Sequence, residues 1–387
     1  MRVLFHAPLK EPDHPVPSGD REMARGLCRL LVSLGARVVR SRAARVPPGT
    51  VPPDRALGSE RRARAQADRL IRRWRALPAG HPERFDLWFT YHCYYRKPDW
   101  LGPLVCRALD VPYVIAEASH APRRAQGPWR VGHRAVERAL AVADRVITVN
   151  PNDLAGVTPR LRPRGRQVQL DPFVDTAPFA LAARQRESHR AMLAARHSLD
   201  PAAPWLTAVA MMRARDKLSS YRVLGEALAQ VLDRPWRLLV VGDGPARAEV
   251  ESALAPLGDR VTLLGALPAT NLPAVYAASD LHLWPAINEA YGMALLEAQA
   301  AGTPVIAGRT GGVPAVVADG ATGLLVPVGD ATSFAAAVRR LLDNPVERAG
   351  FGAAAATRAA RIHDWRGAAR SLSTVLRPLG CGLRLAP

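Results

Sequence analysis

The sequence predicts an α/β protein with two halves, each built around a mostly parallel β-sheet. Segments typical of strands alternate along the chain with segments typical of helices, which is the pattern of βαβ units. The alternation weakens over residues 160–200 and then restarts. The length of 387 residues is also large for one domain and fits two domains of about 150–200 residues.

The first half opens with a short apolar run that fits a buried first strand. A helix is expected over residues 21–35, because Gly35 suits the C-terminal cap of a helix. The strands expected in this half span residues 2–8, 36–41, 85–92, 112–118 and 144–150.

The second half restarts the alternation after an irregular stretch that includes residues 171–179. Its expected strands span residues 205–212, 236–244, 260–267, 280–286 and 303–312, with helices between them. In open sheets of this kind ligands bind beyond the carboxyl ends of the strands, so two facing halves would place the site in the cleft between them. The predicted division is a domain over 1–172, a linker over 173–200, a domain over 201–360 and a last helical segment over 361–387.

Charge is the unusual bulk property of the chain, with a formal net charge of +19. Residues 1–175 hold 31 Lys and Arg against 17 Asp and Glu, so most of the excess lies in the first half. Such a field favours an anionic partner: nucleic acid, lipid head groups or phosphorylated substrates. The basic residues other than three lysines are all arginine, which is also what a GC-rich genome would produce, so both interpretations stay open.

Several classes of protein are disfavoured by composition. There is no run of 18 apolar residues and no small-residue cleavage site after the first apolar run. The cysteines are scattered, with no C-x-x-C spacing, so neither a zinc site nor a disulfide framework is suggested; they are Cys28, Cys93, Cys106 and Cys381. We therefore expect a cytoplasmic protein, with peripheral attachment at the inner membrane face as an alternative.

The stretch NEAYGMALLEAQAAGTP, residues 288–304, offers three features that one ligand could use together. Glu289 falls in the loop after a strand, and Gly292 opens a helix whose first N–H groups can receive an anion. Glu297 lies roughly 6 Å further along that helix, where its carboxylate can accept two hydrogen bonds from a vicinal diol. A nucleotide sugar has a ribose, a diphosphate and a hexose to match. Alternatively, Glu289 is placed favourably near the positive end of the helix dipole, and Glu297 is an ordinary solvated residue on the helix face.

The residues around this stretch carry a family resemblance. The spacing E-x7-E, followed by EAQAAGTPVIAGRTGGVPAVVADGATGLLVPVGD over residues 297–330, resembles the retaining glycosyltransferases of family 4. The resemblance is densest over residues 205–345 and looser elsewhere. It implies the GT-B fold, in which two Rossmann-like domains with parallel sheets face each other across a cleft. The N-terminal domain would then be on the acceptor side, and the C-terminal domain would bind the nucleotide sugar.

The resemblance also implies roles for individual residues. MMRARDKL resembles the family's segment that holds the diphosphate, and PVPSGDREMARGL resembles its N-terminal glycine loop. In the first of these segments Arg213 and Lys217 would hold the diphosphate, and cations aimed at the charge of the departing nucleoside diphosphate are the largest expected catalytic contribution. Without the motif, Arg213 and Lys217 would be read as two exposed basic residues at the start of a helix. The implied catalytic residues are Glu289, Arg213, Lys217 and His120. The implied donor-binding residues are Gly19, Gly292, Met293, Ala294, Glu297 and Gly265.

The sequence departs from the family pattern at one position. Many members carry a histidine directly after the strand matched by PYVIAEA, whereas this chain has Ala118 there and His120 two residues later. Glu117 and His92 are the other candidates to contact the donor hexose. A lone histidine near a strand end is more often an ordinary surface residue, so this assignment rests on the resemblance.

Two other ligand classes are disfavoured. No D-x-D occurs, so a metal-dependent transferase of the other fold is not expected, and we predict neither a metal nor another cofactor. GDGP at 242–245 is half of a dinucleotide fingerprint, with Arg247 in place of the third glycine.

Residues 59–77 predict an amphipathic, strongly basic helix. Its apolar positions share one face at helical spacing; they are Ala63, Ala67, Leu70, Ile71, Trp74 and Leu77. Seven arginines occupy much of the rest. The apolar stripe packs into the core in the simplest interpretation, and the alternatives are docking to an anionic membrane or to RNA. No RNA-recognition motif is present, so a nucleic-acid partner is disfavoured.

The sequence therefore predicts a metal-independent hexosyltransferase that uses a UDP- or GDP-linked sugar and an unknown acceptor, with lipids and glycans among the candidates. A sugar-nucleotide epimerase of the same fold is one alternative, and it would need no acceptor. A non-catalytic basic protein that binds RNA or membrane is the other.

Overall fold

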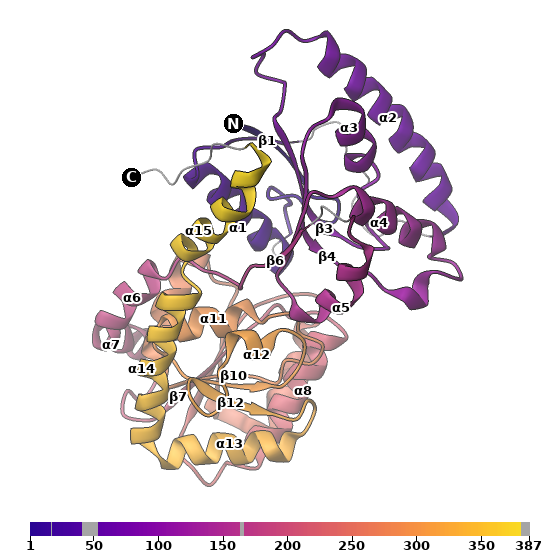
Figure 1. Ribbon diagram of the computed structural model, residues 1–387. Coiled ribbons are helices and arrows are strands. Elements are labelled where there is room, and N and C mark those ends of the chain that lie inside the picture. The colour runs from indigo at the N-terminus through magenta and orange to yellow at the C-terminus, as the bar shows by residue number, and fades with distance from the viewer. Residues whose placement is uncertain (17, 41–52, 163–165, 381–387) are drawn as a thin grey trace. The chain divides into compact units, whose positions relative to one another are not determined.

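The computed structural model describes residues 1–16, 18–40, 53–162 and 166–380, and it divides into two compact units (Figure 1). Unit 1 comprises Met1–Asp171 and Arg366–Pro387, and unit 2 comprises Pro172–Trp365. Each unit contains one six-stranded sheet in which every neighbouring pair of strands is parallel. The predicted α/β fold with two Rossmann-like domains is confirmed.

The sheet of unit 1 has the strand order β2-β1-β3-β4-β5-β6. Its strands are β1 (Arg2–His6), β2 (Arg37–Arg40), β3 (Leu87–Cys93), β4 (Tyr113–Ala118), β5 (Arg145–Thr148) and β6 (Arg166–Gln169). The central strands are apolar on both faces, as expected where helices cover both sides of a parallel sheet. Trp88 and Tyr113, paired in register between β3 and β4, are both fully buried.

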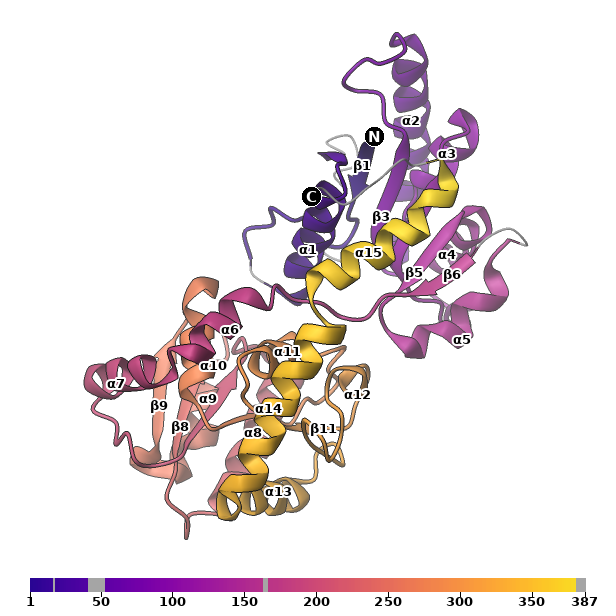
Figure 2. The ribbon, with the colours of Figure 1, turned by 60° about the vertical axis from the view of Figure 1, so that its left-hand side comes forward.

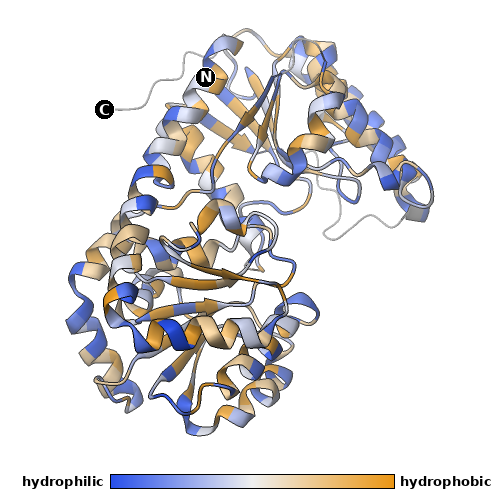
Figure 3. Cartoon of the chain, turned by 60° about the horizontal axis from the view of Figure 1, so that its bottom comes forward, coloured by the Kyte–Doolittle hydropathy of each residue, from blue (hydrophilic) through white to orange (hydrophobic). Residues whose placement is uncertain are grey.

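The helices of unit 1 are α1 (Gly19–Ser33), α2 (Ala56–Ala76), α3 (Gly102–Leu109), α4 (Arg130–Val142), α5 (Leu154–Val157) and α15 (Trp365–Leu376). Ser18 caps α1, because its side chain accepts a hydrogen bond from the Arg21 N–H at 3.2 Å. Figure 3 shows hydrophobic colour concentrated on the strands and on the inner faces of the helices.

Helix α2 buries its apolar stripe in the core of unit 1. Ala63 and Ala67 are buried, and Leu70, Ile71 and Trp74 pack against the same core. All seven arginines of the predicted segment are exposed. The interpretation of this segment as a core-packed amphipathic helix agrees with the structure, and its apolar face is not available to a membrane.

The sheet of unit 2 has the strand order β12-β11-β10-β7-β8-β9. Its strands are β7 (Trp205–Val209), β8 (Arg237–Val241), β9 (Val261–Gly265), β10 (Leu281–Trp284), β11 (Val305–Gly308) and β12 (Gly323–Val326). Its helices are α6 (Ala177–Arg184), α7 (Arg186–His197), α8 (Asp216–Ala229), α9 (Arg247–Leu254), α10 (Leu272–Ala278), α11 (Met293–Ala300), α12 (Val313–Val316), α13 (Ala331–Asp343) and α14 (Pro345–Ile362).

Residues 173–200 differ from the expected linker, because they form α6 and α7, which pack against α10 in unit 2. Two arginines of α7 add polar contacts to the apolar packing of these helices, and one of the two is buried. Arg190 is only 8% exposed and donates to the Ala278 and Ala203 carbonyls, each at 2.6 Å. Arg186 donates to the Ser279 carbonyl at 2.7 Å. A buried arginine at an inward position interrupts the apolar pattern of α7, although Leu193 and Ala194 are buried beside it.

The chain leaves unit 2 at two points that lie side by side. Val174 N–H donates to the His363 carbonyl at 2.9 Å, and Trp365 N–H donates back to the Val174 carbonyl at 3.1 Å. Figures 1 and 2 show α14 followed directly by α15. Residues 366–380 belong to unit 1, while Cys381 and the rest of the predicted segment lie outside the described residues. Among the described helices, none has the length and apolar content needed to cross a membrane.

Candidate functional site

The polar residues predicted in unit 2 follow successive strands of its sheet. Arg213 and Lys217 follow β7, Glu289 follows β10, and a pair of glycines, Gly311 and Gly312, follows β11. Because these strands are parallel neighbours, their carboxyl ends meet at one edge of the sheet, which is where open α/β sheets bind ligands.

Lys217 and Glu289 form the centre of this edge. Lys217 Nζ contacts Glu289 Oε2, although the two residues are 72 positions apart. Trp284 Nε1 donates to the same carboxylate oxygen at 3.1 Å, and Lys217 Nζ lies 5.1 Å from the centroid of the Trp284 ring. The side chains of Lys217 and Glu289 are 27% and 17% exposed. The ammonium group of Lys217 and the carboxylate of Glu289 are therefore held together in a partly desolvated position that solvent still reaches.

The N-terminus of α11 lies next to this pair. Gly292 adopts a left-handed conformation with φ +69° directly before the helix. A Cβ at this position would stand 2.5 Å from Leu295 Cδ1 and 3.6 Å from Glu289 Cγ. Glycine is thus required both by the backbone and by the space. The first-turn N–H groups at Met293 and Ala294 have no partner within the helix, so they can bind an anion.

Gly311 and Gly312 hold the loop that carries Glu289. A Cβ on Gly311 would lie 2.1 Å from the Glu289 carbonyl oxygen, and Gly312 N–H donates to the Ala290 carbonyl at 2.6 Å. The backbone of the β11–α12 loop therefore contacts the backbone of the loop that carries Glu289, with no side chains between them. The sequence contained this signal in TGG, but nothing in its spacing tied it to Glu289.

Glu297 lies one turn inside α11 and is partly buried. The Tyr276 hydroxyl donates to its Oε2 at 3.0 Å. Burial, followed by the charge of Glu297, raises the pKa of Tyr276 well above its ordinary value, so this hydroxyl stays protonated and keeps donating. One carboxylate oxygen is thereby fixed in place, which orients the group for further hydrogen bonds.

Two further predicted residues lie on the same sheet edge at different places. Arg213 is partly exposed, and its carbonyl accepts a hydrogen bond from the Leu218 N–H at the start of α8. Gly265 ends β9, the edge strand, with φ +69°, and its carbonyl accepts from the Gly242 N–H at 2.9 Å. Strands β7 and β8 lie between β9 and β10, so Gly265 ends the third strand from the one that leads to Glu289.

Unit 1 holds the other two predicted residues. Gly19 opens α1, and a Cβ there would meet nothing within 4 Å among the described residues. The His120 side chain is 1% exposed, and its Nε2 lies 3.3 Å from Glu137 Oε1. The imidazole of His120 is therefore engaged inside unit 1 and not presented to solvent.

A second ionisable cluster lies at the ends of β3 and β4. His92 and Glu117 both have φ +62°, a strained conformation for residues with side chains. His92 Nδ1 lies 3.4 Å from Asp20 Oδ1, and Glu117 Oε2 has no hydrogen-bond partner among the described residues. The sequence had offered His92 and Glu117 as alternatives to His120, but it gave no sign of Asp20.

The pKa values of His92 and Glu117 are both raised, whereas that of Asp20 is lowered. Burial lowers the pKa of His92, but the bond to Asp20 and the charges of Glu117 and Asp20 outweigh it and raise the net value. Burial raises the pKa of Glu117, with the negative charge of Asp20 adding to the effect. Carboxyl groups and an imidazole with such shifts are typical of functional sites.

Comparison with known proteins finds similarity to a family in the second half of the chain. Residues 203–344 match the family described as "Glycosyl transferases group 1". The D-inositol 3-phosphate glycosyltransferase of Salinispora tropica is 32% identical over 308 residues, which cover 74% of this chain and 62% of that protein. The chain spans between 37% and 62% of the length of three curated relatives with this name.

Solved structures share the fold across almost the whole chain. Sucrose-phosphate synthase from Thermosynechococcus elongatus has a TM-score of 0.72 at 21% identity, covering 98% of this chain and 99% of that one. HepE of Anabaena, solved in complex with UDP-glucose, has a TM-score of 0.69 at 18% identity, covering 98% and 100%. Residues 203–344 are therefore similar to the group 1 glycosyl transferases, within a chain of GT-B fold.

Proposed function

We propose that this chain is a retaining glycosyltransferase of family 4 that transfers a hexose from a UDP- or GDP-linked sugar to an acceptor. The observation that carries the proposal is the Lys217–Glu289 pair beside the N-terminus of α11, with Glu297 one turn further along the same helix. Cation, helix N-terminus and carboxylate match the diphosphate and the ribose of such a donor. Relatives named as glycosyltransferases support the same reaction class.

The chain's own residues can perform the electrostatic part of the reaction. As the bond between the sugar and the diphosphate breaks, negative charge grows on the departing phosphate. Lys217 supplies a point charge and Arg213 a planar fork at the end of β7, and such preorganised groups are the largest expected catalytic contribution. Glu289, held by Trp284, keeps Lys217 in place until phosphate oxygens compete for the same ammonium group. Glu297 accepts hydrogen bonds from the ribose.

The test is a product analysis with donor labelled in the sugar. Wild-type protein incubated with labelled UDP- and GDP-sugars and an acceptor mixture should release nucleoside diphosphate and move the label to the acceptor. Conversion of the sugar without any acceptor would favour an epimerase. Binding of nucleotide sugar without any turnover, over all donors and acceptors tried, would favour a non-catalytic binding protein. The anomeric configuration of the product decides whether transfer is retaining.

The acceptors to test first are phosphorylated polyols. The relative from Salinispora tropica is named for D-inositol 3-phosphate, and a positively charged first half attracts anions. D-inositol 3-phosphate and D-inositol should therefore be compared directly. Label transfer to both at equal rates would remove the role proposed for the acceptor's phosphate, and lipid or glycan acceptors would be tested next.

The transfer is proposed to need no Mg²⁺ or Mn²⁺. The sequence has no D-x-D, and Lys217 with Arg213 supplies the positive charge that a divalent ion would otherwise bring. Turnover should persist in EDTA at the rate seen with added Mg²⁺. Loss of turnover that Mg²⁺ or Mn²⁺ restores would contradict this part of the proposal.

Peripheral attachment to an anionic membrane at the inner face is proposed through the arginine face of α2. Because the apolar stripe packs in the core, attachment would be purely electrostatic, at about 1 kcal/mol for each arginine near the surface. Replacing Arg61, Arg62, Arg72 and Arg73 with Gln should abolish binding to vesicles rich in phosphatidylserine and leave donor binding unchanged. Vesicles that the wild type ignores at low salt would exclude this mode of attachment.

A further inference from the structure

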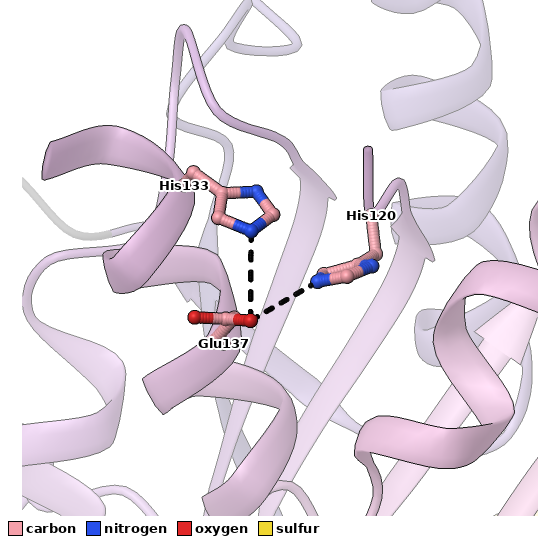
Figure 4. A group of neighbouring side chains, drawn as sticks. All are labelled: His120, His133 and Glu137. Carbon is pink, nitrogen blue, oxygen red and sulfur yellow. Dashed lines mark hydrogen bonds and ion pairs between the residues drawn. The ribbon is translucent and has the colours of Figure 1, made fainter. Parts of the chain in front are cut away.

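Two histidines and a glutamate converge inside unit 1 (Figure 4). His133 and Glu137 are four residues apart on α4, so they share one face of the helix. His120 comes from the loop after β4. Its Nε2 and that of His133 lie 3.3 Å and 3.5 Å from the same carboxylate oxygen, Glu137 Oε1.

These separations are long for hydrogen bonds and right for ligands of a metal ion. An N–H···O bond has a typical length of about 2.9–3.0 Å. Ligands at about 2.0–2.1 Å from a tetrahedral zinc ion are about 3.3–3.4 Å from one another.

The scaffold around the three side chains is rigid. A Cβ on Gly132 would lie 2.0 Å from the Tyr95 carbonyl, so α4 packs directly against that backbone. A Cβ on Gly156 would lie 2.8 Å from the His120 carbonyl, so α5 holds the backbone of His120 in the same way. Both histidine side chains are at most 2% exposed, whereas Glu137 is 36% exposed. An ion there would be held from inside and would meet water on the Glu137 side.

We propose that His120, His133 and Glu137 bind a divalent transition-metal ion, with Zn²⁺ as the best match. Two imidazoles and one carboxylate form a known set of three protein ligands for zinc, with water in the fourth position. Nitrogen ligands select against Mg²⁺ and Ca²⁺, which take oxygen. The possible ligand atoms lie within 4.8 Å of one another, so small rotations of the two rings complete the site.

The ion would act as a clamp on the segment between His120 and His133. This segment joins β4 to α4 and contains Arg124, which lies 5.1 Å from the centroid of the Tyr95 ring. Fixing both ends to one ion shortens the free loop and stabilises the folded state by mass action. All three ligands belong to unit 1, and none follows a strand of unit 2.

Arg160 provides an internal check on the proposal. Its Nη1 lies 3.9 Å from Glu137 Oε1, and its side chain is 48% exposed. A positive guanidinium beside the carboxylate competes with a metal ion. Arg160→Gln should therefore tighten metal binding several-fold. A cluster that only shared protons would show no such response.

The experiment uses the full chain without a histidine tag, stripped with EDTA and dialysed. Zn²⁺ titrated in competition with a chromophoric chelator should bind at one ion per chain. Co²⁺ should give visible d–d absorption without thiolate charge-transfer bands, because no cysteine belongs to the site. His133→Ala and Glu137→Gln should each weaken Zn²⁺ binding by at least about 100-fold, since even outer-shell partners cost 10–100-fold.

The control is His197→Ala, a partly buried histidine at the end of α7 in unit 2, which should bind Zn²⁺ as the wild type does. The melting temperature should rise with Zn²⁺ in the wild type and in the control but not in Glu137→Gln. The proposal is overturned if the wild type shows no saturable Zn²⁺ binding. It is equally overturned if Glu137→Gln, the most exposed of the ligands and the safest to replace, binds as tightly as the wild type.

Discussion

The two units share the same type of parallel sheet, yet different kinds of residue follow the ends of their strands. In unit 2, glycines let two backbone segments come into contact, as Gly311 does at the Glu289 carbonyl. The Lys217–Glu289 ion pair lies at the same strand ends. In unit 1, the corresponding ends carry His92 and Glu117 in strained conformations, with Asp20 beside them. The first arrangement is a rigid cradle for a ligand of fixed shape. The second holds titratable side chains whose charges depend on one another.

This contrast fits a division of labour between donor and acceptor. A nucleotide diphosphate is the constant part of a sugar donor, so a site for it can be built from backbone and fixed charges. Acceptors vary, and side chains can change without altering the fold.

Lys217→Ala should reduce the turnover number by about 10²–10³-fold, the usual loss when one group that stabilises transition-state charge is removed. Arg222→Ala, an exposed cation on the same helix, is the control and should retain activity. The measurement is release of nucleoside diphosphate at saturating donor. Activity within a few-fold of the wild type would show that the phosphate charge is met elsewhere.

Glu297→Ala should weaken the binding of nucleoside diphosphate by about 1.5–3 kcal/mol, or roughly 10–150-fold, the range for hydrogen bonds to a charged group. Tyr276→Phe removes only the hydroxyl that holds the carboxylate, so it should cost less. Calorimetry on both variants decides the matter. Unchanged affinity in Glu297→Ala would refute the assignment of this residue to the ribose.

Gly311→Ala should destabilise the protein more than Gly320→Ala does. Both glycines have positive φ, so both variants lose about 1–2 kcal/mol of unfolding free energy from backbone strain. Only at Gly311 would the new methyl group also meet the Glu289 carbonyl, which adds about 1–3 kcal/mol. Denaturant unfolding gives the difference, and the Gly311 variant should also lose donor affinity. Equal destabilisation of the two variants would mean that the β11–α12 loop moves away from the Glu289 carbonyl at no cost in unfolding free energy.

Asp20→Asn should change stability only within a window of pH. The raised pKa of His92 means that its pairing stabilises the fold below about pH 6.5 and that this contribution is lost as pH rises through the raised value. The lowered pKa of Asp20, in which its bond to His92 outweighs the burial that would raise the pKa, supplies stability above about pH 4.

The wild type should therefore exceed this variant most between about pH 4 and 6.5. Because Asp20 is partly exposed, the gap should stay below about 1 kcal/mol, or about 2–3 °C in Tm. Asp68→Asn, on the exposed face of α2, should show no such window. A gap that grows above neutral pH would contradict the ion pair.

Physical pattern in the sequence accounts for most of the fold and for part of the site. Apolar runs such as that of β8 are visible because a buried parallel strand is apolar on both faces. Helix α7 was not visible, because Arg190 enters the core through hydrogen bonds to carbonyls. The approach of Lys217 to Glu289 was expected from a family resemblance, and the contact of Gly311 with the same loop was not, since only the fold brings them together.

The convergence of His120, His133 and Glu137 was missed for a similar reason. Two of the three residues, His133 and Glu137, lie on adjacent turns of one helix. Their spacing of four residues is common in any surface helix. The third lies 13 positions before His133, and it reaches the same carboxylate because α5 packs against the His120 backbone and α4 against the Tyr95 backbone. Pair distances along a sequence carry no information about such a meeting.

The scarcity of lysine gives the protein a built-in chemical reporter. Besides the α-amino group, the only amines are those of Lys10, Lys97 and Lys217. Lys97 is 1% exposed, so an amine-reactive acylating reagent has few targets in the folded chain. Mass spectrometry of the acylated peptides would read the modification of Lys217 separately from that of Lys10. A nucleotide that shields Lys217 and spares Lys10 would reveal itself by protection alone, with no acceptor, no label and no turnover.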